Sequence, residues 1–108
     1  AVLVRAIEPV EGVSKMMELR YKKEAKQGWQ QRLKNLSNGP GKLSMAMGIN
    51  KNNNEMDLCG NKLFLANKSG GDNFSIISTQ RINIDYAEEA VHFPWRYYIK
   101  DNPFVSKK

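Results

Sequence analysis

Cysteine and histidine are nearly absent from this sequence of 108 residues, since Cys59 and His92 are the single examples of each. One cysteine excludes a disulfide within the chain, and one histidine excludes a histidine-rich metal site. A metal site built from these residues is therefore not expected, and no other motif in the sequence indicates a cofactor. Sparse cysteine fits a reducing intracellular compartment, either the bacterial cytosol and nucleoid or the nucleus. Cys59 is predicted to be a small buried residue, and His92 to be a surface or packing residue.

Long apolar runs are also missing. No stretch approaches the roughly 20 residues of a membrane-spanning helix, and no secretory signal pattern opens the chain, so we expect no membrane partner. A P-loop is excluded as well, because residues 39–43 lack its spacing and Lys42 is not followed by a hydroxyl residue. None of the 11 acidic residues is singled out by its position as a catalytic base.

Positive charge, in contrast, is abundant. The chain holds 17 basic and 11 acidic residues, a formal net charge of +6, in a length that allows one modest domain or part of one. This balance favours a polyanionic partner, nucleic acid before a membrane surface, although many basic domains bind neither. Residues 22–34 carry most of the local excess and are predicted to form a solvated face or a face along a phosphate backbone. Trp29 is predicted to cover the core rather than to stack on a base.

Hydrophobic periodicity predicts an α+β fold. Val13, Met16, Met17 and Tyr21 recur at helical spacing and predict an amphipathic core helix over residues 11–24. Strands are expected at residues 1–7, 62–66, 74–78, 81–85 and 95–99, with a hairpin loop at 67–73 and a helical turn at 86–90. These strands should form a mostly antiparallel sheet packed against the helix. Because the chain starts at Ala1, within a strand-like run, we expect further sequence upstream.

Two basic features stand out within these elements. Arg5 falls inside the first apolar run, where it needs a carboxylate, a phosphate or water as a partner, and a structural ion pair is one of these options. Residues 38–43 predict a tight turn that feeds a short helix with Pro40 in its first turn and Gly48 at its end. With Lys42 beside the helix N-terminus, this is a candidate phosphate site, and a turn of purely structural importance is the alternative.

Four blocks spread over nearly the whole chain carry a family resemblance. They are residues 2–12, residues 38–51 with their Asn-Gly-Pro-Gly-Lys-Leu turn, residues 81–89 and residues 94–106. In this order they resemble the C-terminal half of the alkyladenine (3-methyladenine) DNA glycosylases. The resemblance implies that residues 1–108 are the C-terminal part of one glycosylase domain, whose N-terminal part carries the catalytic glutamate.

The resemblance also implies a function in base-excision repair. Members of the family flip an alkylated purine out of duplex DNA from the minor-groove side and hydrolyse its N-glycosidic bond, without a metal or a covalent intermediate. By this resemblance, Arg5 helps to hold the nucleophilic water, and Ile82 reaches the water and the base through its backbone groups. Leu3 lines the base pocket. Because arginine cannot accept a proton, the implied role of Arg5 is orientation rather than general base catalysis.

The DNA-backbone contacts follow from the same resemblance. Lys42 and Lys51 match lysines that meet DNA phosphates, and Gly41 and Asn83 complete the expected set, with Asn83 standing where many members have glycine. Because the catalytic glutamate belongs to the N-terminal half, we expect the isolated chain to be inactive and to bind DNA weakly and with strong salt dependence. A non-catalytic module that binds DNA or RNA, and a fragment with no activity of its own, are the alternatives.

Overall fold

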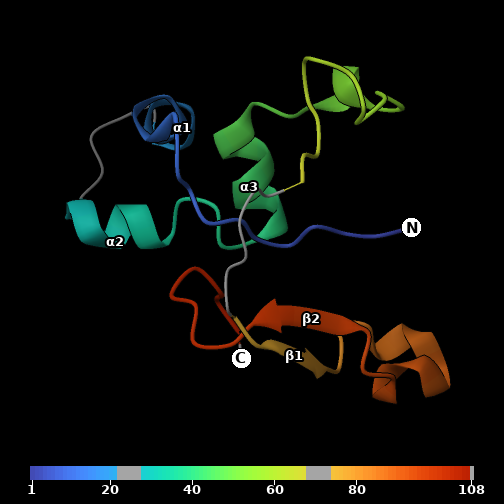
Figure 1. The fold of residues 1–108 in the computed structure, drawn as a ribbon. Helices are drawn as coiled ribbons and strands as arrows, with labels where there is room; N and C mark the ends of the chain where they lie inside the picture. Colours follow the sequence, from blue (N-terminus) through green and yellow to red (C-terminus); the bar gives the residue numbers. More distant parts are fainter. Residues whose placement is uncertain (22–27, 68–73, 108) are drawn as a thin grey trace.

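The structure is a computed structural model that describes residues 1–21, 28–67 and 74–107. Within these ranges it contains two classes of helix and one sheet: the α-helices α1 (Val13–Arg20), α2 (Trp29–Lys34) and α3 (Pro40–Met47), the 3-10 helices η1 (Lys51–Asn53) and η2 (Asp85–His92), and the strands β1 (Ile76–Thr79) and β2 (Arg96–Ile99). In Figure 1 the α-helices lie above the sheet, and the extended N-terminal stretch runs below α3 and above β2. The predicted α+β class is confirmed.

The buried core forms where α1 packs against α3. Met16 and Met17 of α1 are buried with Ala46 of α3, and they surround Leu36, which has no exposed surface. The partly buried side chains of Val13 and Tyr21 pack against the same cluster, as the helical periodicity predicts. The helix itself is shorter than predicted because it ends at Arg20. Residues 22–27, which include the end of the predicted helix, lie outside the described residues.

The limits of α3 match the sequence prediction. Gly39 is the N-cap and Pro40 occupies the first turn, where a missing N–H costs the helix no hydrogen bond. Gly48 ends the helix in the left-handed conformation, with φ of 67°. Its N–H donates to the Met45 carbonyl at 3.2 Å, as is common where glycine ends a helix.

The segment between α2 and α3 is fixed by hydrogen bonds from two other parts of the chain. Arg20 donates from Nε to the Leu36 carbonyl at 2.9 Å and from Nη2 to the Asn35 carbonyl at 3.1 Å. Ser37, which is fully buried, donates from Oγ to the Ile7 carbonyl at 2.9 Å, and the Ile7 N–H donates to the Ser37 carbonyl at 3.2 Å. This two-way pairing joins the N-terminal stretch to the start of α3.

The sheet is smaller than predicted. The predicted strands at 74–78 and 95–99 correspond to β1 and β2, which are antiparallel with Ile77 opposite Tyr98. The predictions of strands at 1–7, 62–66 and 81–85 are wrong, because these residues form no strand in the structure. An apolar or alternating run becomes a strand only beside a partner that accepts its hydrogen bonds, and the sequence pattern does not report the partner. Residues 68–73 of the predicted hairpin loop lie outside the described residues.

Other local predictions also need correction. No helix was predicted at α2, which occupies part of the basic run, and Trp29 at its start is 53% exposed rather than part of the core. Cys59 is exposed rather than buried. Helix α1 packs on α3, whereas the sheet was expected to cover it. Among the described residues, no helix has the length and apolar character needed to cross a membrane.

We expect Arg20→Ala to lower the free energy of unfolding by about 1–3 kcal/mol, because the part-buried carbonyls of Asn35 and Leu36 would both lose their donor. Urea denaturation of the two proteins measures this difference. Lys15→Ala is the matched control in α1, since among the described residues Lys15 makes one exposed pair, with Glu18 at 3.6 Å. Its effect should stay within about 0.5 kcal/mol. Equal losses in both variants would contradict the importance of the Arg20 contacts.

Candidate functional site

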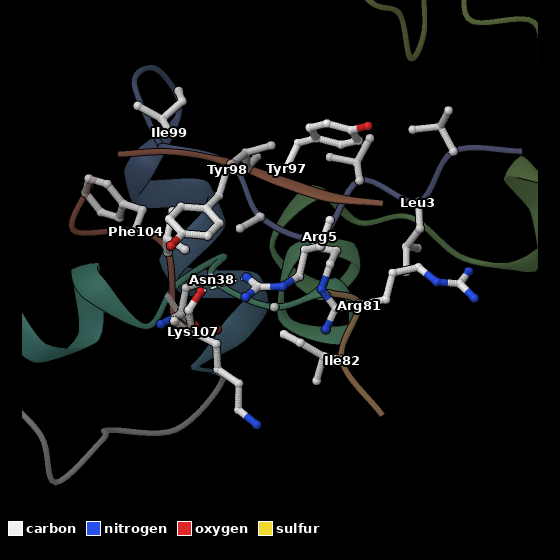
Figure 2. Close-up of a pocket in the computed structure, with 18 of the residues that line it drawn as sticks. Leu3, Arg5, Asn38, Arg81, Ile82, Tyr97, Tyr98, Ile99, Phe104 and Lys107 are labelled. Carbon is white, nitrogen blue, oxygen red and sulfur yellow. Dashed lines mark hydrogen bonds between the residues drawn. The ribbon is translucent and has the colours of Figure 1, made fainter. Parts of the chain in front are cut away.

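A pocket of about 1050 Å³ lies between the N-terminal stretch and the sheet. Its walls come from residues 1–8, from Asn38 and Gly39 before α3, from residues 76–86 in part, and from residues 95–107 in part. Arg5, Ile82 and Leu3, the three residues that the sequence predicts at the water and base positions, all line it (Figure 2). The structure therefore brings together residues that are almost 80 positions apart in the chain.

Arg5 enters this pocket from the irregular N-terminal stretch. It lies two residues before Ile7, whose pairing with Ser37 holds the stretch in place. In the described part of the chain the one side-chain ion pair joins Lys15 and Glu18, so Arg5 has no carboxylate partner there. The structural ion pair that the sequence left open for Arg5 is thus absent from the described residues. Its guanidinium group is available to a ligand in the pocket.

Ile82 lies at a bend, in the segment that was predicted to be a strand. Among the described residues, its N–H and C=O groups make no hydrogen bond to another backbone group. The next residue, Asn83, has φ of 55°. This left-handed conformation is readily adopted by glycine, and asparagine tolerates it better than most other residues. Asn83 can therefore hold the bend that presents the Ile82 backbone with less strain than most other side chains would meet there.

Arg81 is a pocket residue that the sequence pattern does not single out. Its guanidinium carbon lies 5.6 Å from the centre of the Trp95 ring, and its buried Nε has no hydrogen-bond partner among the described residues. Figure 2 shows the side chains of Arg81 and Arg5 in the same central part of the pocket. The only signal in the sequence was its position directly before Ile82, inside a block that carries the family resemblance.

The pocket has a strong excess of positive charge. Its lining includes four basic residues, Arg5, Arg81, Arg96 and Lys107, and one acidic residue, Glu8. Arg96 is engaged with the protein, since it donates to the carbonyls of Gln80 at 2.9 Å and Lys107 at 2.8 Å. The guanidinium groups of Arg5 and Arg81 are therefore the ones left to attract an anion.

The predicted phosphate residues lie outside this lining. Lys42 is linked to the pocket indirectly, because its Nζ donates to Oδ1 of Asn38 at 3.1 Å and Asn38 is a lining residue. Gly41 is exposed in the first turn of α3, and Asn83 is also exposed. Lys51 is exposed in η1, whose first turn is fixed by side-chain bonds between Asn50 and the residues that follow it. The structure thus places the phosphate candidates on the surface, where Lys42 bonds the pocket residue Asn38 and Asn83 lies in the chain between the pocket residues Ile82 and Ile84.

The described residues do not form a recognisable metal centre. Within the described residues there is no group of three or more His, Cys, Asp or Glu side chains that could hold a metal ion. Neither His92 nor Cys59 lines the pocket, and Cys59 is exposed. The lining of the pocket offers guanidinium groups, one carboxylate, an ammonium group, hydroxyls, amides, aromatic rings and backbone groups.

We expect Asn83→Gly to leave the free energy of unfolding within about 1 kcal/mol of the unchanged chain, because glycine adopts φ of 55° without strain. Asn83→Val should cost about 1–3 kcal/mol, because a β-branched residue is strained there. Asn54→Val is the control, since Asn54 is exposed and has φ of −59°. Thermal unfolding of the three variants measures these effects. If Asn83→Val were as stable as the control, the assigned backbone conformation would be contradicted.

Comparison with known proteins identifies the family of this chain. Residues 1–103 match the family described as methylpurine-DNA glycosylase. The chain is 54% identical over 108 residues to a protein of Alkaliphilus oremlandii and 50% identical over 107 residues to one of Clostridium tetani, both named "Putative 3-methyladenine DNA glycosylase". These alignments cover 100% and 99% of this chain and 53% of each relative, so the chain spans about half the length of the curated relatives it matches. The chain belongs to the methylpurine-DNA glycosylase family.

Proposed function

We propose that this chain is part of a DNA glycosylase that removes alkylated purines of the 3-methyladenine type from duplex DNA. Family membership and the names of the relatives support the substrate class. The observation that carries the proposal is the shared pocket, which collects Arg5, Ile82 and Leu3 from distant parts of the sequence. The reaction is hydrolysis of the N-glycosidic bond, and its polyanionic substrate suits the net charge of +6.

The proposed reaction begins with the damaged nucleotide flipped out of the duplex from the minor-groove side. Flipping costs a few kcal/mol, least for damaged or mispaired bases, and this difference favours lesions over normal bases. The volume of the pocket, about 1050 Å³, leaves room for a flipped nucleotide. In this arrangement Leu3 forms part of the apolar wall beside the base.

Water then attacks the sugar as the alkylated purine departs. Alkylation makes the purine a better leaving group, so the protein needs mainly to position the water and to complement the transition state. Arg5 orients that water and places positive charge near it, because a guanidinium has only donors and keeps its proton. Ile82 contributes its backbone N–H and C=O groups, which make no backbone hydrogen bond within the described residues. A role of the backbone explains why an apolar side chain occupies this position.

The remaining machinery is proposed to come from sequence beyond this chain. By the family resemblance, the catalytic glutamate, the residues that sandwich the base and the side chain that fills the gap in the duplex belong to the N-terminal half. The relatives are about twice as long as the aligned segment, which leaves room for such a half. The isolated 108 residues should therefore be inactive and should contribute Arg5 and the Ile82 backbone to a composite site.

Mixing the two halves tests this proposal. We expect release of 3-methyladenine from alkylated duplex DNA only when the chain is combined with the N-terminal half of the Alkaliphilus relative. In that mixture Arg5→Ala should lower the single-turnover rate by about 100-fold or more, because the water loses its orienting group. Lys100→Gln removes one charge at a residue outside the pocket lining and should leave the rate nearly unchanged. Two folded halves that bind each other and release no base would refute the enzyme assignment.

The second candidate is a non-catalytic module that binds DNA or RNA through the exposed lysines. The observation that favours it is the exposure of Lys42 and Lys51 on a chain of net charge +6. We expect the affinity of the chain for duplex DNA, measured by fluorescence anisotropy, to fall steeply with salt. Lys51→Gln should reduce the slope of the logarithm of the DNA association constant against the logarithm of the salt concentration by about 1. Lys62 lies outside the four blocks that carry the family resemblance, so Lys62→Gln should change this slope little. Salt-independent binding would contradict both candidates.

A further inference from the structure

We propose that Arg81 binds a phosphodiester group of the DNA strand whose nucleotide enters the pocket. The inference rests on the proposed function, because it takes DNA as the ligand, and it adds a residue that the family resemblance did not assign. It starts from an unsatisfied donor. Among the described residues, the buried Nε of Arg81 has no hydrogen-bond partner, which is uncommon for a buried polar atom in a folded protein.

Arg81 differs from the other arginines of the chain in what surrounds it. Arg32 also has a buried Nε without a partner in the described residues, but it lies in α2 and does not line the pocket. Arg96 lines the pocket, but its donors are used by the carbonyls of Gln80 and Lys107. Within the described part of the chain, Arg81 combines a free buried donor with a place in the pocket wall.

An aromatic support holds the Arg81 side chain in position. Its guanidinium carbon lies 5.6 Å from the centre of the Trp95 ring, within the range of a cation–π contact. Trp95 is itself packed edge-on against Phe93, with the ring centres 4.8 Å apart. A guanidinium that is already held on a ring loses less conformational entropy when a ligand binds, so the site is partly organised before the ligand arrives.

The surrounding charge selects an anion. A guanidinium presents N–H donors and no acceptor, and the guanidinium of Arg5 lines the same pocket without a carboxylate partner in the described residues. Glu8 is the single acidic residue of the lining and forms no ion pair in the described structure. Phosphate oxygens match the planar fork of arginine, and every nucleotide that reaches the pocket brings a phosphate on each side of its sugar. Arg81 would thus hold the strand while Arg5 remains free to orient water.

Fluorescence of Trp95 offers a direct readout. The sequence contains two tryptophans, so Trp29→Phe leaves Trp95 as the single tryptophan and places the reporter next to Arg81. We would titrate this chain with a duplex of about 12 base pairs, roughly one turn of B-DNA, that carries one unpaired nucleotide, and record the change in Trp95 emission. The unpaired nucleotide can enter the pocket without the opening of a base pair. The dissociation constant would be measured over a range of salt concentrations. The same titration would be repeated with Arg81→Gln, Arg81→Lys and the charge-matched control Lys100→Gln.

We expect Arg81→Gln to weaken DNA binding by about tenfold and to lower the slope of log K against log salt by about 0.9, the contribution of one phosphate contact. The change in Trp95 emission should be reduced as well. Arg81→Lys should recover the salt slope but only part of the affinity, because an ammonium is a point charge without the fork. Lys100→Gln should behave as the unchanged chain. Circular dichroism shows whether Arg81→Gln is folded. If it is not, Arg81→Lys is compared with Lys100→Gln, and the inference then requires that Arg81→Lys binds DNA more weakly than Lys100→Gln.

Unchanged affinity and salt slope in Arg81→Gln would overturn the inference. It would also fall if Arg81→Gln left DNA binding intact but abolished association with the N-terminal half, since Arg81 would then pair with a carboxylate of that half. Base release is measured separately in the mixed halves. A mixture without release, together with the expected loss of DNA affinity in Arg81→Gln, would refute the glycosylase function and leave the phosphate contact standing.

Discussion

The structure depends on the buried segment from Leu36 to Asn38. Leu36 fills the centre of the helical core, while Ser37 bonds the N-terminal stretch and Asn38 bonds Lys42. The carbonyl of Leu36 accepts a hydrogen bond from Arg20 of α1. One short connection thus joins the core, the pocket wall and the start of α3. A disturbance there would reach all three, because buried backbone groups need their partners.

The pocket is held open by polar contacts between distant segments rather than by burial of its walls. On one side the Ile7–Ser37 pairing fixes the stretch that carries Arg5, and on the other side Arg96 joins the segment after β1 to Lys107. Leu3, in the same stretch as Arg5, remains 65% exposed. Few contacts therefore determine the shape of the cavity, and their geometry controls how close its guanidinium groups come to a ligand.

The sequence predicted the features that depend on residues close together in the chain, namely the buried face of one helix and the ends of another. The spacing of Met16 and Met17 identified the buried face of α1, and Pro40 and Gly48 marked the ends of α3, because helix periodicity and capping act within a few residues. The three wrong strands required a pairing partner that periodicity does not specify. The joint place of Arg5 and Ile82 in the pocket was reached through family resemblance rather than through physical pattern.

Contacts between distant residues escaped prediction for the same reason. The contact of Arg81 with Trp95 is formed across η2, and no alternation of polar and apolar residues reports it. The exposure of Cys59 was equally hidden, since a small apolar side chain fits either a core or a loop. That exposure has a practical consequence, because Cys59 is the single cysteine and lies outside the pocket lining. A thiol-reactive dye or tether can be attached there at one defined position, without engineering another cysteine and without touching the cavity.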